Sequence, residues 1–271
     1  MIKDITIGQY FPGKSFLHSL DARDKLCLTF AFIVMIFVCK NFFSLAVMLL
    51  LALLMSLLSR IPARTILKSF RPILPIIILT SALQLYYNDS GTVWFEYWKF
   101  KLTSGGVFTA IFMAVRICTL ILVSSLLTYT TSPTLLTDAI ERLLSPLKIF
   151  KVKVHTLAMM MTIALRFIPT LIDEIDRIMS AQKARGADFE TGSLITRARA
   201  LIPIFVPLFV SSFKRAYELA FAMECRCYRG GEGRTRMRKM KFSWRDYAAI
   251  AFFCGCFAAV IYLNISFEHL I

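Results

Sequence analysis

Five apolar stretches limit this chain to folds that cross a membrane. A helix needs ~20 mostly apolar residues to span a bilayer core of ~30 Å. The stretches that approach or reach this length cover residues 26–38, 42–58, 72–87, 107–129 and 246–263. The chain is 57% hydrophobic, whereas soluble domains contain ~45–50% apolar residues. We therefore predict an all-α membrane protein with about five transmembrane helices.

Lysine and arginine are distributed unevenly between the two sides that these spans define. Segments 1–25 and 59–71 carry four each and segment 131–245 carries twenty, whereas the opposite side holds Lys40, Lys99 and Lys101. Basic residues accumulate in cytoplasmic loops. We therefore expect a multi-pass protein of the cell (plasma) membrane. Its N-terminus and the 131–245 segment would be cytoplasmic, and its C-terminus would be external.

This charge distribution divides the chain into three parts. We predict an N-terminal membrane domain of four spans at 1–130, a cytoplasmic domain at 131–244 and a C-terminal transmembrane helix at 245–271. Within the cytoplasmic domain, apolar periodicity predicts one short helix and two long helices. The long helices cover about 154–184 and 194–227. Because each would reach ~45 Å at ~1.5 Å per residue, we expect the two to cross.

The short helix begins at Ser132-Pro133 and ends near Ser145-Pro146. Its large aliphatic side chains recur at helical spacing along one face. They are Leu136, Ile140, Leu143, Leu144 and Leu147. We expect this face to lie at the membrane surface and to contact a partner.

The two long helices end alike, each in an arginine between small residues. The first end is Ala184-Arg185-Gly186 and the second is Cys225-Arg226-Cys227. Such an arginine can cap the last carbonyls of its own helix, and capping is the favoured interpretation for either end alone. Because the pattern occurs twice, we favour a second role. Each guanidinium would enter a partner's groove and pair bidentately with a carboxylate.

Further motifs are spread along nearly the whole chain. Residues 20–26 read L-D-A-R-D-K-L, residues 128–133 read T-Y-T-T-S-P, and residues 166–169 read R-F-I-P. With the two arginine ends, they resemble the transmembrane T component of energy-coupling factor (ECF) transporters, whose opening commonly reads L-D-P-R-T-K. The second arginine end departs from the family's Ala-Arg-Gly at both flanks, which leaves Gly230-Gly231 as an alternative stop for its helix.

The resemblance implies a coupling subunit that performs no catalysis and binds no cofactor. Its partners would be two ABC-type ATPase subunits and one small integral-membrane S component, which captures a vitamin or other micronutrient. Arg185 and Arg226 would each dock in one ATPase. The apolar face of the short helix would form part of a platform for the S component, and the 131–244 segment would be the coupling domain.

Two other features favour different functions less strongly. Gly8 to Ser15 fits the phosphate-loop pattern G-x-x-x-x-G-K-[ST]. However, Pro12 has no N–H to offer a phosphate, and a span follows instead of a parallel sheet. Arg116 lies within the fourth span. We expect it to have a structural role, bonded to carbonyls or to hydroxyls such as those of Ser124 or Thr119.

A self-contained secondary transporter remains the alternative function. Such a protein would carry intramembrane acids and inverted repeats of broken helices, yet the five spans contain no acidic residue except Asp246 at an edge. A membrane-embedded enzyme would need a catalytic cluster, and none stands out. A zinc site at Cys225 and Cys227 would lack two ligands. The net charge of +15 lies in particular loops and so indicates topology, with no nucleic acid as a partner.

Overall fold

A computed structural model describes residues 10–87, 92–97, 100–189, 191, 193–230 and 242–266. The chain separates into two compact units. We name the first the bundle unit; it comprises Gly8–Ala139 and Lys239–Ile271. The second, the helix-pair unit, contains Ile140–Arg238.

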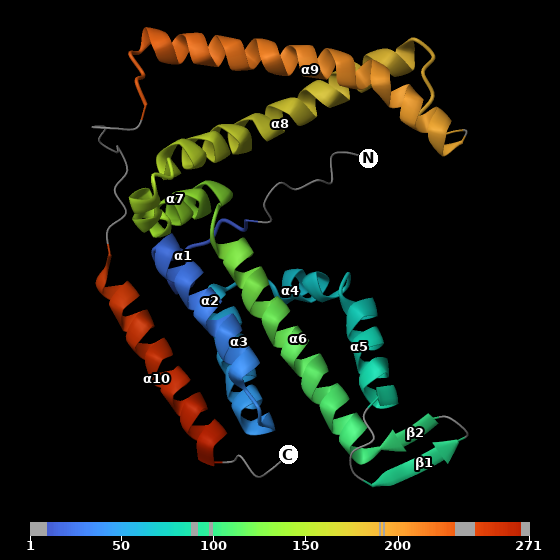
Figure 1. Ribbon diagram of the computed structural model, residues 1–271, viewed down its shortest axis with the longest axis vertical. Coiled ribbons are helices and arrows are strands. Elements are labelled where there is room, and N and C mark those ends of the chain that lie inside the picture. Colours follow the sequence, from blue (N-terminus) through green and yellow to red (C-terminus); the bar gives the residue numbers. More distant parts are fainter. Residues whose placement is uncertain are drawn as a thin grey trace. The chain divides into compact units, whose positions relative to one another are not determined.

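The bundle unit is built mainly from helices that pack around α6. In chain order its elements are α1 (Phe16–Ser19), α2 (Ala22–Val38), α3 (Phe42–Ser59), α4 (Ala63–Phe70), α5 (Leu74–Tyr87), β1 (Val93–Tyr97), β2 (Phe100–Thr103), α6 (Ser104–Thr130) and α10 (Trp244–Ser266), and α7 (Pro133–Leu143) begins in it. Helix α6 contacts α2, α3, α4 and α5, and α10 packs on α2 and α3 (Figure 1). The strands β1 and β2 form an antiparallel hairpin.

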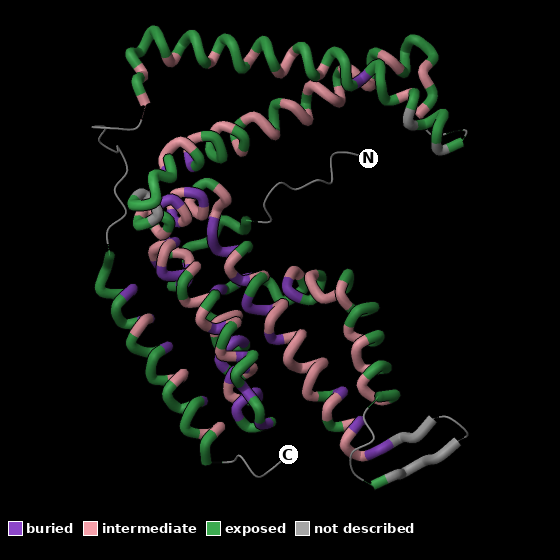
Figure 2. The backbone as a smooth tube through the Cα atoms, viewed as in Figure 1, coloured by how far each residue is buried: buried purple, intermediate pink, exposed green. Residues whose placement is uncertain are grey.

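One apolar cluster forms the core of the bundle unit. Its most deeply buried members are Phe32 and Ile36 on α2, Met48 on α3 and Val260 on α10, each at most 1% exposed. Figure 2 shows this buried material between α2, α3 and α6. The outer faces stay apolar and exposed, as at Leu57 (79%). A core covered by a second apolar layer is typical of a protein whose solvent is lipid.

Polar contacts fix both ends of α10 to α2. At one end the Asp246 carboxylate, 1% exposed, accepts the N–H of Asp21 at 2.9 Å and that of Ser243 at 2.7 Å. At the other end Asn264 donates to the Val38 carbonyl at 3.0 Å and accepts the Ser44 hydroxyl at 2.7 Å. Each contact satisfies a polar group near a helix terminus, where the backbone lacks helical partners.

The beginning of α2 is capped by Asp21. Its Oδ1 accepts the Arg23 N–H at 3.0 Å, and its Oδ2 pairs with the Arg23 guanidinium at 2.8 Å. Partial burial works to raise the pKa of Asp21, but the hydrogen bonds from Arg23 outweigh it and hold the pKa below its ordinary value. The same guanidinium lies 4.4 Å from the centre of the Phe242 ring. These contacts place the start of α2 beside the start of α10.

The helix-pair unit is dominated by two long helices that pack on each other. It contains the end of α7, a 3-10 helix η2 (Ser145–Phe150), α8 (Val154–Ala184) and α9 (Leu194–Cys225). The bounds agree with the predicted long helices to within two residues. An ion pair joins them, from Arg215 to Glu174 at 3.0 Å. A second contact, from Glu141 to His155 at 3.1 Å, connects α7 with the beginning of α8.

The all-α class with about five spans is confirmed, but the set of helices differs in part from the prediction. By length and apolarity, α3, α6, α8, α9 and α10 could cross a membrane, and α4 with α5 forms a pair bent by 54° that could be a sixth span. Helix α2 has only 17 residues. Helices α8 and α9 qualify because each contains a sufficiently long apolar stretch, although both also carry charged residues. Their cytoplasmic placement therefore stays a prediction that rests on charge.

Candidate functional site

The end of α8 has a well-defined backbone geometry. Arg185 is the last residue before the turn, and Gly186 follows with φ of +86°. The Gly186 N–H donates to the Lys183 carbonyl at 3.0 Å, and the Ala187 N–H donates to the Gln182 carbonyl at 3.0 Å. This pair of bonds is the Schellman motif, in which a left-handed residue closes the helix.

The end of α9 repeats this geometry without a glycine. Cys227 adopts φ of +56° and its N–H donates to the Glu224 carbonyl at 2.8 Å. The Tyr228 N–H donates to the Met223 carbonyl at 3.0 Å. The alternative stop at Gly230-Gly231 is wrong, because α9 ends at Cys225. Gly230 also has a positive φ, but it lies beyond the closed end. A cysteine therefore occupies a left-handed position that normally favours glycine.

Both arginine side chains at these ends are exposed. Among the residues that the structure describes, neither Arg185 nor Arg226 forms an ion pair or a side-chain hydrogen bond. The terminal carbonyls that an arginine could have capped are instead bonded to backbone N–H groups. Side-chain capping, the favoured interpretation for one end alone, is therefore not what the described residues show. Within the described part of the chain, the donors of both guanidinium groups therefore stay available for a partner.

The two ends point in opposite directions. Because α9 returns along α8 after a short connection, the C-terminus of α8 lies near the start of α9, and the C-terminus of α9 lies at the far end of the pair (Figure 1). Helix α9 has 32 residues, which corresponds to ~48 Å. Arg185 and Arg226 therefore stand at opposite ends of one helix pair, each flanked as predicted by Ala184 and Gly186 or by Cys225 and Cys227.

The ion pair between the two helices lies at a matched distance from the two ends. Glu174 precedes Arg185 by the same number of residues as Arg215 precedes Arg226. Each interval corresponds to about three helical turns, or ~16 Å. The Glu174 and Arg215 side chains are 25% and 32% exposed, so the pair is only partly shielded from solvent. The ion pair thus joins α8 and α9 at a point equally far, along each helix, from the arginine at its end.

The predicted face of the short helix is only partly available. Leu136, Ile140 and Leu143 on α7 are half-buried, and Leu144 is 38% exposed. The side chain of Leu147, in η2, lies outside the described part of the chain. The face is therefore shared between internal packing and an outward surface.

A larger apolar surface on α9 was missing from the sequence-based prediction. From Leu201 to Phe221, every fourth residue is large, apolar and 41–74% exposed: Leu201, Phe205, Phe209, Phe213, Tyr217 and Phe221. We name this row the α9 stripe. Because a helix has 3.6 residues per turn, a repeat of four forms one continuous row that winds gradually around the helix. The period was present in the sequence, but interpreting it required knowing that these side chains stay exposed when α9 packs on α8.

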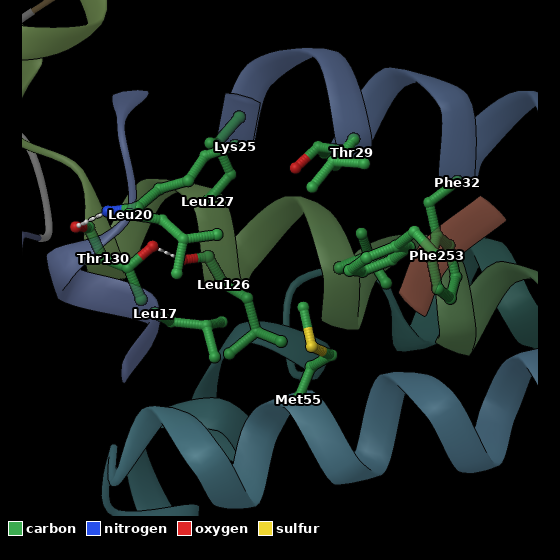
Figure 3. Close-up of a pocket in the computed structure, with 12 residues that line it drawn as sticks. Leu17, Leu20, Lys25, Thr29, Phe32, Met55, Leu126, Leu127, Thr130 and Phe253 are labelled. Atoms are coloured by element: carbon green, nitrogen blue, oxygen red, sulfur yellow. Dashed lines mark hydrogen bonds between the residues drawn. The ribbon is translucent and has the colours of Figure 1, made fainter. Parts of the chain in front are cut away.

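The bundle unit contains a separate cavity at the end of α6. Apolar residues of α1, α2, α3, α6 and α10 line it, with Lys25 at one end (Figure 3). Lys25 is 9% exposed and its Nζ donates to the Thr130 carbonyl at 3.1 Å and to the His18 carbonyl at 3.4 Å. A cation there complements the negative end of the α6 dipole. The lysine thereby fixes the C-terminus of α6.

Arg116 makes contacts within the bundle that would suit the structural role predicted for it. Its Nη2 donates to the carbonyl of Cys39, the residue that follows α2, at 2.6 Å. The guanidinium lies 4.6 Å from the centre of the Phe112 ring. A carbonyl partner was predicted, whereas the hydroxyls of Ser124 and Thr119 are not its partners: the Thr119 hydroxyl donates to the Val115 carbonyl at 2.8 Å. Arg116 thus caps a neighbouring helix.

The phosphate-loop pattern serves a local structural purpose in its described part. Ser15 caps α1, where its hydroxyl accepts the N–H of His18 at 3.4 Å and lies 2.6 Å from the His18 ring. Gly8 and Gln9 lie outside the described residues. Likewise, no group of three or more His, Cys, Asp or Glu side chains within the described ranges could hold a metal ion.

These helices define a multi-pass α-helical membrane protein with paired arginine ends. Residues 13–237 match the family described as cobalt transport protein, CbiQ. A relative from Ruminiclostridium cellulolyticum, named energy-coupling factor transporter transmembrane protein EcfT, is 50% identical over 247 residues, 91% of this chain and 92% of that protein. The protein of the same name from Bacillus subtilis is 45% identical over 250 residues, 92% of this chain and 94% of its own length. The chain therefore belongs to this family of transmembrane components of energy-coupling factor transporters.

Proposed function

We propose that this chain couples two ABC-type ATPase subunits to one S component in an ECF-type importer of a vitamin or other micronutrient. One observation carries the proposal. Two helix ends with the same Schellman geometry present exposed arginines, unpaired among the described residues, at opposite ends of one helix pair. As a transmembrane component of a transporter, the chain would transmit motion while ATP hydrolysis takes place in the separate ATPases.

The geometry of the ends favours two separate docking partners. At up to ~48 Å apart along α9, Arg185 and Arg226 are too distant to enter one groove. Each end is closed by backbone hydrogen bonds, so the guanidinium can be inserted without leaving terminal carbonyls unsatisfied. A planar guanidinium can then bind a buried carboxylate through two parallel hydrogen bonds. Because Glu174 and Arg215 join the two helices, a movement at one end can be passed to the other.

The apolar surface for the S component would consist of the α9 stripe together with the outward part of the α7 face. The S component is a membrane protein, so a long apolar row suits it better than it suits a soluble ATPase. The beginning of α7 is attached to a fixed point. Tyr129 accepts the Phe11 N–H at 3.0 Å through its carbonyl, and its hydroxyl lies 2.5 Å from the Ser69 hydroxyl. With Lys25 on Thr130, these contacts hold the end of α6 just before α7 begins.

The direct test replaces both arginines by glutamate. We expect Arg185→Glu with Arg226→Glu to abolish ATPase association and uptake, because each change removes one side of a charge pair, worth roughly 2–5 kcal/mol. This corresponds to a ~30- to several-thousand-fold loss of local affinity at ~1.4 kcal/mol per tenfold. A single variant would retain partial assembly through the other end. Co-purification of the ATPases with the membrane complex measures the effect.

The matched control reverses two other exposed charges on the same helices, neither of which stands at a helix C-terminus. Arg177 on α8 and Arg199 on α9 are both exposed, and Arg177→Glu with Arg199→Glu should leave ATPase association near the wild-type level. If the end variant still binds both ATPases and transports at the wild-type rate, the coupling role of the arginines is wrong. An equal loss in the control would indicate a general effect of charge instead.

A further inference from the structure

Helix α4 in the bundle unit presents a face of one charge sign that the proposed coupling function does not use. Arg64, Lys68 and Arg71 recur at four- and three-residue spacing and are all exposed. Leu67 lies among them and is 68% exposed. Residues at this spacing share one side of a helix. The outer surface of α4 is therefore a row of cations interrupted by one large apolar side chain.

No acidic group within the described residues neutralises this row. The sequence contains no aspartate or glutamate between Lys25 and Asn88, and none of the three cations forms an ion pair in the described part of the structure. The opposite face of α4 is occupied by internal packing. Ile66 is buried in the core, and the Ser69 hydroxyl lies 2.5 Å from that of Tyr129. The cations are therefore not needed to hold α4 in place.

Helix α5, which follows, provides an apolar wall next to the cations. It contains no charged residue and no buried residue. Five of its aliphatic side chains are 47–66% exposed: Leu74, Ile76, Ile78, Leu79 and Leu83. Helices α4 and α5 meet at a bend of 54°, and α4 lies across the end of α5 (Figure 1). An amphipathic helix with a basic polar face that lies across the end of a span is the pattern of a helix at the membrane–water interface.

We propose that the corner between α4 and α5 binds an anionic phospholipid. The phosphate of the head group would be held by Arg64, Lys68 and Arg71, and the acyl chains would lie along α5. Clustered lysine and arginine beside a span attract anionic lipids, and arginine matches the geometry of a phosphate oxygen pair. An acidic protein would match the cations, but it would leave the apolar wall of α5 uncovered. A lipid matches both surfaces at once.

The test measures lipid binding to the full chain, both alone and in the assembled transporter. Wild type and the triple variant Arg64→Gln, Lys68→Gln, Arg71→Gln are purified into lipid-depleted detergent and titrated with phosphatidylglycerol or phosphatidylcholine, with bound lipid counted by native mass spectrometry. We expect wild type to prefer phosphatidylglycerol, and the triple variant to lose about 100-fold of this affinity, or ~3 kcal/mol at ~1.4 kcal/mol per tenfold. Raising the salt concentration should weaken phosphatidylglycerol binding in wild type and have little effect in the variant.

Three further variants keep the test decisive. The triple Arg177→Gln, Arg199→Gln, Lys214→Gln removes as many exposed charges from α8 and α9 and should bind phosphatidylglycerol like wild type. Lys68→Arg keeps the charge and should also bind normally. If the triple variant fails to fold, Lys68→Gln alone serves as the test and should lose roughly fivefold in affinity for phosphatidylglycerol. An unchanged lipid preference in the α4 triple variant, or no preference in wild type, overturns the proposal. Loss of a protein partner with lipid binding retained would assign the face to protein docking and overturn it as well.

Discussion

The two helix ends share one backbone geometry but differ in the residue at its left-handed position. Replacing the glycine at one end, and introducing a glycine at the other, should therefore have opposite effects on the stability of the two ends. Gly186 has φ of +86° and Cys227 has φ of +56°. A side chain in this region costs ~1–2 kcal/mol because its Cβ approaches the following carbonyl oxygen. No atom lies within 4 Å of a Cβ built on Gly186. The cost of Gly186→Ala therefore comes from the backbone angle and not from crowding.

The magnitude follows from this single cost. We expect Gly186→Ala to destabilise the closed end of α8 by about 1 kcal/mol, which makes its opening about fivefold more frequent. Cys227→Gly should stabilise the end of α9 by about 0.5–1 kcal/mol, because relief of the strained angle exceeds the entropy that glycine adds to the open state.

Hydrogen exchange of the backbone amides measures both effects locally. The amides to follow are those of residues 186 and 187 for α8, and of residues 227 and 228 for α9, since each closes its helix by a hydrogen bond. Exchange should accelerate in Gly186→Ala and slow in Cys227→Gly. Gly255→Ala is the matched control: this glycine lies inside α10 with no atom near a built Cβ, so the change should leave both ends unaffected. Equal protection in Gly186→Ala and wild type would refute the reasoning.

Three further predictions address topology, the S-component surface and the bundle. In a background without native cysteines, Glu96→Cys should be labelled in intact cells by an impermeant reagent and Gly186→Cys should not; the reverse result would mean that the orientation derived from charge is wrong. Phe209→Asp or Phe213→Asp on the α9 stripe, and Ile140→Asp or Leu144→Asp on α7, should remove the S component from the purified complex while the ATPases remain, whereas full S-component stoichiometry in all four would exclude this surface. Asp246→Ala should lower the thermal stability of the purified protein by the equivalent of ~2–4 kcal/mol, because two backbone N–H groups lose their acceptor, and an unchanged melting temperature would show that water replaces the carboxylate.

Helix bounds and helix ends were largely predictable because their signals are local. The 154–184 helix was predicted from periodicity alone and matches α8, and Arg185 and Arg226 were identified from their small neighbours. The end of α9 was harder to predict. Propensity favours glycine at a left-handed position, and the sequence offered Gly230-Gly231, yet the chain uses Cys227. A non-glycine residue there is stabilised by the hydrogen bonds of the closed end, which cannot be read from residue type.

The partners of polar groups were less predictable than their roles. Arg116 was expected to bond to a carbonyl, but the one it uses, Cys39, is distant in sequence and belongs to the turn between α2 and α3. Asp246 was seen only as an acidic residue at the edge of a span, whereas it joins α10 to the beginning of α2. Both contacts depend on which helices pack together. Periodicity identifies the apolar face of each helix but does not specify its neighbours.

The exposed surfaces of the two units suggest a division of roles between them. In the bundle unit, the exposed apolar faces of α3 and α5 suit lipid, and Arg64, Lys68 and Arg71 lie at the end of that surface. In the helix-pair unit, the α9 stripe lies on a helix whose second half also carries exposed charges, such as Lys214 and Glu218. A lipid-facing helix would have to bury those charges in hydrocarbon, at ~2.5–3.5 kcal/mol for each group at the bilayer centre. A protein partner avoids this cost, because it can cover the stripe and leave the charged side in water. This physical difference favours docking over membrane insertion for α9.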